Sequence, residues 1–277
     1  MLEITIARLY EFMTVLYALS VLLYFIDFLH KNRKANKTAF WLLAIVWVLQ
    51  TIFLFLRMLD TGRIPILTLY EGMFFYIWVL ITLSLIINRL LKIDFIVFFT
   101  NVIGFLIMAI HTFTPYQHGS QVVAQQLESE LLIFHITLAI LSYGAFSLSF
   151  TFSLLYLIQY ELLKKKKWGK LLLRIQDLSK LDHMSYVLNV IGVPLFLLSL
   201  ILGTIWAYMK IPHFHWYDMK VIGSVLVLAS YSLYLYKRLR EGLSGKAIAN
   251  WNIIAFLVVL VNFLLLGRLS NFHFWIL

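Results

Sequence analysis

Long runs of apolar residues dominate the sequence, and short clusters of charged or turn-forming residues separate them. A helix needs about 20 apolar residues to cross the bilayer core. Eight runs have about that length: 9–29, 39–59, 67–87, 95–114, 131–160, 184–209, 216–236 and 247–269. The pattern predicts an all-α polytopic membrane protein with eight transmembrane helices, in a single domain over 1–277. The first run begins at once, without a basic n-region, so no cleavable signal sequence is predicted.

Basic residues between the runs predict the orientation in the membrane. Of the 23 Lys and Arg residues, 17 lie in 30–38, 88–94, 161–183 and 237–246. The other six lie at the opposite ends of the runs: Arg8, Arg57, Arg63, Lys210, Lys220 and Arg268. Cytoplasmic loops carry the excess of Lys and Arg. We therefore expect a multi-pass protein of the cell membrane with both termini outside (N-out/C-out).

Composition excludes several classes of protein. Hydrophobic residues make up 62% of the chain and charged residues 13%, about half the charged share of a soluble domain. The absence of cysteine excludes disulfides, Cys-ligated zinc, iron–sulfur clusters and covalent C-x-x-C-H heme attachment within this chain. We interpret the net charge of +10 as a topology signal rather than as nucleic-acid binding. No nucleophile–base array, phosphate-binding loop or zinc motif is found, so the sequence does not predict an enzyme.

Residues 164–182 are neither a predicted span nor a short turn. Four lysines precede apolar residues that alternate with basic ones, which predicts a basic amphipathic helix on the cytoplasmic leaflet. Two interpretations stay open: an anchor on anionic lipid, or a docking site for a cytosolic protein.

Charged residues near the ends of the runs need partners. Arg8 and Glu11, and likewise Arg57 and Asp60, stand three residues apart, which predicts local pairing. Glu71 has no such neighbour, and we expect it to meet an outer Arg or Lys or a polar edge of a ligand site.

The histidines carry the main chemical signal. His30 and His183 lie at the cytoplasmic edge, the other six at the outer edge, and none near the middle of a span. This argues against a b-type cytochrome that carries electrons across the membrane. His135 lies just inside the outer boundary, and His273 follows the last run at the same depth. One neutral imidazole from each side is the arrangement for bis-His heme iron; the alternative is an interfacial histidine bonded to backbone or water.

The outer loop over 203–220 is rich in aromatic residues. Trp206, Trp216 and Tyr217 are flat rings that can stack on a porphyrin, and Asp218 and the lysines can fix its polar edges. The alternative is an aromatic belt at the membrane interface. His213 and His215 form a His-x-His pair, which alone is weak evidence for a metal site.

These residues carry a resemblance to a known family. The chain resembles the heme-handling cytochrome c assembly family, the CcsA/CcmC/CcmF group, and within it the members found beside heme-biosynthesis genes. That family has a Trp-rich loop between outward-facing histidines, and here Gly203-x-x-Trp206-Ala207 and the spacing from Trp206 to Asp218 match. Further matches are His135 with Tyr143, Asn271-Phe272-His273, Leu181-Asp182-His183-Met184-Ser185-Tyr186, and Pro65, Leu69-Tyr70-Glu71 and Trp78.

One position departs from the family pattern. The family's ligases carry a histidine near the cytoplasmic end of the span after the Trp-rich loop, and Tyr236 stands there instead. It is therefore doubtful that this chain has the inner heme site of the ligases. Whether Tyr236 or His183 forms an inner site stays open.

The resemblance implies a heme-handling protein with non-covalent heme b, held by His135 and His273 as iron ligands and by the Trp-rich loop. It also implies a negative effect on the level of glutamyl-tRNA reductase, whose pathway components are candidate partners. The alternatives are heme transport or delivery to extracytoplasmic cytochrome c, and a transporter for another planar or apolar solute.

Overall fold

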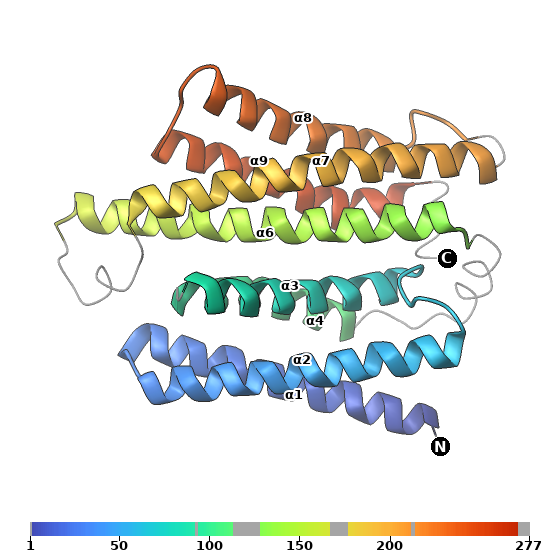
Figure 1. Ribbon diagram of the computed structural model, residues 1–277, viewed down its shortest axis with the longest axis horizontal. Coiled ribbons are helices and arrows are strands. Elements are labelled where there is room, and N and C mark those ends of the chain that lie inside the picture. Colours follow the sequence, from blue (N-terminus) through green and yellow to red (C-terminus); the bar gives the residue numbers. More distant parts are fainter. Residues whose placement is uncertain (1, 92–93, 113–127, 167–176, 212–213, 271–277) are drawn as a thin grey trace. The chain divides into compact units, whose positions relative to one another are not determined.

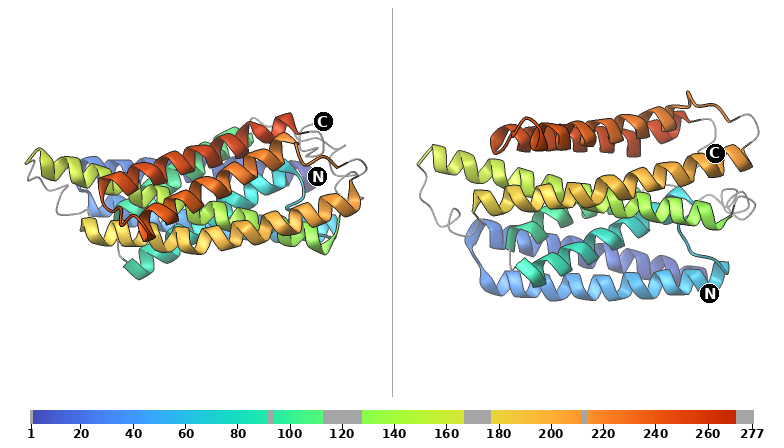
Figure 2. Two further views of the ribbon diagram at one scale, coloured as in Figure 1. Left: turned by 90° about the horizontal axis from the view of Figure 1, so that it is seen from above. Right: turned by 45° about the horizontal axis from the view of Figure 1, so that its top comes forward.

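The computed structural model describes residues 2–91, 94–112, 128–166, 177–211 and 214–270, which form helices and short connections without strands. Eight of these helices are long and apolar enough to cross a membrane, which confirms the all-α prediction. In chain order the elements are α1 Leu2–His30, α2 Arg33–Thr61, α3 Leu69–Leu91, α4 Asp94–Thr112, α6 Glu130–Lys164, α7 Leu178–Lys210, α8 Met219–Leu239, α9 Lys246–Leu264 and the 3-10 turn η1 Leu266–Leu269 (Figures 1 and 2).

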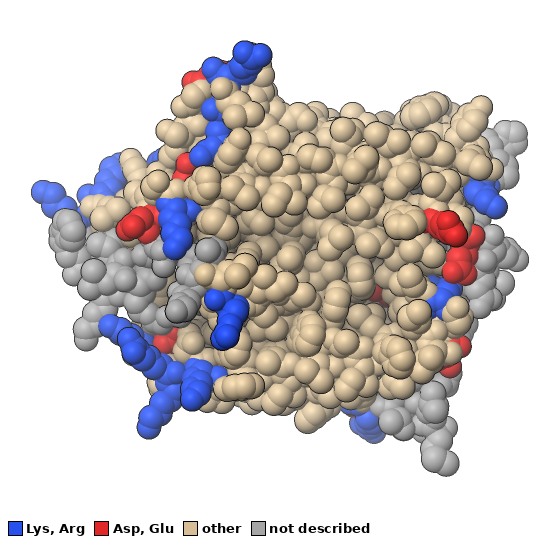
Figure 3. Space-filling view, viewed as in Figure 1, with Lys and Arg blue, Asp and Glu red and all other residues tan. Residues whose placement is uncertain are grey.

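The surface between the helix ends is apolar. In the face that Figure 3 shows, charged side chains gather at the helix ends, and the area between them carries almost none. Large side chains such as Phe12, Phe55 and Ile254 are more than half exposed. Such a surface is costly in water but suits lipid, so the chain is a multi-pass membrane protein.

The helices form two compact units. Unit 1 comprises 1–65 and 70–115, and unit 2 comprises 66–69 and 116–277. In each unit, we call "basic end" the ends of the helices that flank 30–38, 88–94, 161–183 and 237–246. The other end is the "opposite end". The prediction of a single domain over 1–277 stays a prediction.

Unit 1 is held together by polar side chains within an apolar bundle. Between α2 and α3, Trp47 Nε1 donates to Thr82 Oγ1 at 2.7 Å and Trp78 Nε1 donates to Thr51 Oγ1 at 2.9 Å. Asn101 of α4 accepts from the Tyr17 hydroxyl of α1 at 2.9 Å. Hydrogen bonds of this kind join helices in lipid, where apolar burial provides little net attraction.

Unit 2 packs α6 closely against α7, and α8 and α9 against this pair. The buried face of α6 is rich in small residues, which allow close helix approach: Ser142, Gly144, Ala145, Ser147, Ser149 and Ser153. At the basic end, Arg238 of α8 forms a two-pronged ion pair with Asp182 of α7 at 2.6 and 2.8 Å. Lys246 of α9 pairs with Glu161 of α6 at 3.0 Å. These contacts join the helix termini of the basic end in two pairs, α7 with α8 and α6 with α9.

The predicted amphipathic helix over 164–182 lies largely outside the described residues, which omit 167–176. The structure describes the end of α6 at Lys164 and the start of α7 at Leu178. The amphipathic helix therefore stays a prediction.

Candidate functional site

His135 lies in the second turn of α6, at the opposite end of unit 2. Its Nδ1 lies 2.7 Å from the backbone oxygen of Ser199 on α7. A carbonyl oxygen only accepts, so Nδ1 carries the proton. The Ser199 hydroxyl donates to the His135 carbonyl at 2.8 Å and lies 3.0 Å from Nδ1, where it serves as a second acceptor. In the neutral ring, Nε2 therefore keeps its lone pair, and no described residue forms a hydrogen bond with it. This is the form in which histidine binds a metal.

Gly203 makes room for the His135 ring. A Cβ atom at Gly203 would lie 2.5 Å from both Cε1 and Nδ1 of His135. Any larger residue would push the imidazole away from Ser199, which lies one turn earlier on α7. The glycine of the Gly203-x-x-Trp206 motif thus has a physical role, because it lets the two helices hold this imidazole between them.

Polar groups from three helices surround the same end of unit 2. Asn262 of α9 is fully buried, and its amide nitrogen donates to the Tyr143 hydroxyl of α6 at 3.1 Å. The ammonium of Lys220, in the first turn of α8, donates to the backbone oxygen of Asn262 at 3.0 Å. Lys220 is also close enough to act electrostatically on His135. Lys220 and Asn262 therefore place polar groups at the same end of unit 2 as His135, and Asp218 acts electrostatically on Lys220.

Asp218 and Trp206 are the buried members of the loop motif. Asp218 is the N-cap of α8, where its carboxylate accepts from the Lys220 backbone N–H at 2.8 Å. Trp206 lies near the end of α7 with 6% of its surface exposed. Its indole N–H is buried and has no hydrogen-bond acceptor among the described residues. A buried donor without an acceptor costs free energy in the absence of a ligand.

The remaining aromatic rings of the loop face outward. Trp216 and Tyr217 are 66% and 70% exposed. Tyr217 stacks on His215 at 4.9 Å between ring centres, and Trp216 meets Phe214 edge to face at 5.4 Å. His213 lies outside the described residues, so the His213-x-His215 pair is described only at His215. No group of three metal-binding side chains is found in the described part of the chain.

These residues fit a heme group. His135 offers a neutral imidazole with a free Nε2, the exposed rings offer flat apolar surface, and Trp206 offers an unused donor for a carboxylate. His273, the predicted second ligand, lies outside the described residues. The structure thus describes six of the eight predicted site residues: His135, Trp206, His215, Trp216, Tyr217 and Asp218. Contacts link His135 to Ser199 and Gly203 of α7, whereas none of the described contacts joins Trp216 or Tyr217 to His135.

Comparison with known proteins gives the family. Residues 66–273 match the family described as Cytochrome C assembly protein. Protein HemX of Bacillus subtilis (strain 168) is 62% identical over 275 residues, which cover 99% of this chain and 100% of that protein. The chain belongs to the cytochrome C assembly protein family, as a HemX-type member. Protein HemX of Brevibacillus brevis is 46% identical over 96% of this chain and 97% of its own. Cytochrome c biogenesis protein CcsA of Mesostigma viride is 28% identical over 82% and 83%.

Two further motifs of the family resemblance have structural explanations. Asp182 and Tyr186 both hold Arg238, the first by the two-pronged ion pair and the second with its ring 4.7 Å from the guanidinium.

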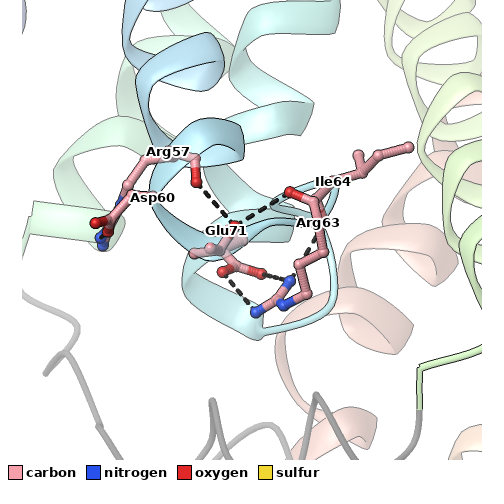
Figure 4. Close-up of polar contacts among 6 residues, drawn as sticks. Arg57, Asp60, Arg63, Ile64 and Glu71 are labelled. Carbon is pink, nitrogen blue, oxygen red and sulfur yellow. Dashed lines mark hydrogen bonds and ion pairs between the residues drawn. The ribbon is translucent and has the colours of Figure 1, made fainter.

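Glu71 forms a buried, two-pronged ion pair with Arg63 at 2.9 and 3.0 Å (Figure 4). The expectation that Glu71 meets an Arg or Lys is therefore confirmed, as are the pairs Arg8–Glu11 and Arg57–Asp60.

Neither candidate for an inner iron ligand is enclosed in the part of the basic end that the structure describes. Tyr236, in the place of the family histidine, is 56% exposed, and His183 is also exposed. Neither side chain forms a hydrogen bond or ion pair with another described residue that would fix its orientation. This agrees with the doubt that the Tyr236 departure raises about an inner heme site.

Sequence reasoning missed a second polar layer nearer the basic end of unit 2. Its members are the buried residues Ser149, Ser153, Ser185, Asn189 and Asn252. Asn252 Nδ2 lies 2.8 to 3.1 Å from three serine hydroxyls, and its Oδ1 accepts from Asn189 at 2.9 Å. A spacing of ten residues, about 15 Å along a helix, separates the two layers on two helices: Asn189 and Ser199 on α7, and Asn252 and Asn262 on α9.

Proposed function

We propose that this protein binds heme b non-covalently at the opposite end of unit 2, with His135 and His273 as the axial iron ligands. The observation that carries the proposal is the His135 geometry: Nδ1 is fixed as a donor to Ser199, and Nε2 is free. Asp218 supports the site by holding the start of α8 and thus the position of Lys220. When bound, the heme would supply the iron that needs these two imidazoles.

We further propose that this end faces outward, as the 17 to 6 distribution of basic residues predicts. Because the chain has no cysteine, single-cysteine variants can be labelled without background. A membrane-impermeant reagent should reach cysteines at Glu128 and Tyr217 in intact cells. It should reach those at Lys34, Lys166 and Glu241 only after permeabilisation. The reverse pattern would put the heme site on the cytoplasmic side and refute the outward site.

For the biological role, we propose that the protein controls heme biosynthesis by lowering the level of glutamyl-tRNA reductase. The similarity to two proteins named HemX over almost their full length supports this role. Deletion of the gene should raise the abundance of the reductase and leave cytochrome c maturation intact. Loss of cytochrome c with unchanged reductase would overturn the proposal.

The alternative role is heme transport or delivery in extracytoplasmic cytochrome c assembly. The CcsA relatives favour it. Tyr236 in the place of the family histidine, and its exposure, speak against loading through an inner site. The deletion experiment separates the two roles, because only a delivery component is required for cytochrome c maturation.

If heme binds on the outer side, its effect on the reductase must be transmitted to the cytoplasm. The basic segment 164–182 is a candidate surface through which the protein acts there. We propose that this segment contacts anionic lipid or a cytosolic protein. Neutralising Lys164, Lys165, Lys166 and Lys167 to Gln should weaken control of the reductase if a protein docks there. If the segment is a lipid anchor, the same change should reduce membrane insertion instead.

A further inference from the structure

The turn between α1 and α2 carries a compact group of cations at the basic end of unit 1. We call them the hairpin cations, and all four side chains are exposed: Lys31, Arg33, Lys34 and Lys37. None of them forms a side-chain hydrogen bond or an ion pair with another described residue. The carboxylate of Asp27, one turn earlier, is buried and accepts from the Asn36 amide at 2.9 Å. One carboxylate against four cations leaves an excess of three positive charges in this turn.

The opposite end of the same unit is different. Each of its three arginines has an acidic partner within the chain: Arg8 with Glu11, Arg57 with Asp60, and Arg63 with Glu71. An excess of cations at one end is also the topology signal of a membrane protein. That signal depends on how many cations a loop carries, and it does not require that they lack partners. The hairpin cations are therefore available for anions from outside the chain.

Lys31 pays a conformational cost for its place in this group. It adopts the left-handed backbone conformation, with φ of 53°, and its N–H donates to the Asp27 backbone oxygen at 2.9 Å to end α1. Glycine or asparagine is favoured there, because the Cβ of other residues crowds the backbone. At its opposite end, α2 uses Gly62 in this conformation. Among the described residues, the one other non-glycine residue with a positive φ is Lys166, also at a basic end. A lysine is thus kept where glycine would relieve strain.

The face of α2 that carries two of these cations indicates the partner. Lys34, Lys37 and Trp41 are spaced by three and four residues, so they share one face of the helix. Trp41 is 59% exposed and lies about 6 Å farther along the helix than Lys37. Tryptophan is typical of the level of the lipid headgroups. An anionic phospholipid offers a phosphate to the cations and apolar surface to Trp41, whereas a soluble acidic protein would engage the cations alone.

We propose that the hairpin cations bind the headgroup phosphate of anionic phospholipids, with Lys31, Lys34 and Lys37 as contacting residues. A single cation near an anionic membrane surface contributes about fivefold in affinity. The site is in unit 1 and does not depend on the proposed heme function. It is also distinct from the segment 164–182, which follows α6 of unit 2.

The test uses a chain that has no cysteine of its own. The full-length protein with Thr38→Cys carries a fluorophore beside the hairpin cations and is reconstituted into phosphatidylcholine vesicles. Brominated phosphatidylglycerol and brominated phosphatidylcholine are compared as quenchers, which gives their relative affinity at the label. Phosphatidylglycerol should be preferred at least about fivefold. A label at Leu59→Cys, near the other end of α2, is the matched control and should show no preference.

Variants of the labelled protein test the residues. Lys34→Gln/Lys37→Gln should lose most of the preference, and Lys34→Arg/Lys37→Arg should keep it. Lys31→Gly should lower the preference and raise the midpoint of thermal unfolding in neutral detergent by about 2–4 °C, because strain is relieved. A lower midpoint would overturn the role of Lys31.

Equal affinity for the two lipids at Thr38→Cys would overturn the proposal, and so would an unchanged preference in Lys34→Gln/Lys37→Gln. Inorganic phosphate should not displace the lipid more than chloride of equal ionic strength does. Specific displacement by phosphate would assign the cations to a soluble phosphate compound and overturn the lipid site. If the glutamine variant fails to accumulate, the comparison of the two lipids at the two label positions still decides.

Discussion

His111 in unit 1 and His135 in unit 2 show how two similar histidines in one chain differ in what they can bind. Both lie near a helix terminus at the opposite end of their unit. His111 is fully buried, its Nε2 donates to the Tyr70 backbone oxygen at 3.0 Å, and its Nδ1 accepts from the Tyr10 hydroxyl. In His135, only Nδ1 forms a hydrogen bond with a described residue, and its partner is Ser199. Both nitrogens of His111 thus stabilise the bundle, whereas one nitrogen of His135 is left for a ligand.

The largest effect is expected when the proposed iron ligands are removed, because this tests directly whether His135 differs from His111 in binding heme. The double substitution His135→Ala/His273→Ala should abolish the Soret band of bound heme while the protein still inserts into the membrane. The reason is that both proposed iron ligands are removed. The measurement is the heme content per purified protein.

His111→Ala is the matched control, because it removes an imidazole that has no free nitrogen. It should retain full heme content. Full heme content in the double variant would show that the ligand assignment is wrong, and His213 and His215 would be the next pair to test.

A smaller effect is expected where the surroundings of His135 are changed and the ring is kept. Gly203→Ala should weaken heme binding about 10- to 100-fold, as for other groups that orient a metal-binding histidine. The new methyl group would collide with the ring. Gly192→Ala, on the same helix, places a methyl group 2.6 Å from Phe146 instead. If both variants lose heme equally, the loss comes from helix packing rather than from His135.

The two histidines should also differ in their effect on stability. Tyr10→Phe removes the hydroxyl that donates to buried His111, and leaves its Nδ1 without a partner. We expect a loss of about 1–3 kcal/mol in the free energy of unfolding, measured by denaturation in detergent, with heme affinity unchanged. Ser199→Ala keeps the backbone acceptor of His135 and should cost less stability. The opposite ranking would contradict the structural role of His111.

The sequence predicts much of the fold because the membrane imposes simple rules. Eight apolar runs became eight helices, since each helix must satisfy its own backbone within lipid. The helix ends extend beyond the runs, as at α6, which reaches Lys164 rather than 160. Charged and polar residues continue a helix beyond the apolar core, so hydropathy alone does not show where it ends.

The site was predictable in its residue types but not in its contacts. His135, Trp206 and Asp218 stood out as candidates from the sequence pattern and the family resemblance. The pattern gave no indication that Ser199 and Gly203 fix the His135 ring, because these contacts join residues more than 60 positions apart. Likewise, nothing in the sequence indicated that both nitrogens of His111 have partners, Tyr10 and Tyr70, because these residues are also far from it in the chain.

The smallest effects are expected at the exposed aromatic rings. Trp216→Ala and Tyr217→Ala should each weaken heme binding several-fold, since a stacked aromatic face contributes about 0.5–1.5 kcal/mol beyond simple burial. The Soret maximum should stay in place, because neither ring is a proposed iron ligand. A shifted maximum in either variant would mean that the loop contributes an iron ligand.

The absorption spectrum of the purified, heme-loaded wild-type protein, before and after reduction with dithionite, tests the central claim most directly. A site with two imidazole ligands should give a low-spin, six-coordinate spectrum, with a Soret band and resolved α and β bands on reduction. No Soret band in protein from heme-replete cells would contradict the account, and so would a high-spin spectrum unaffected by His135→Ala.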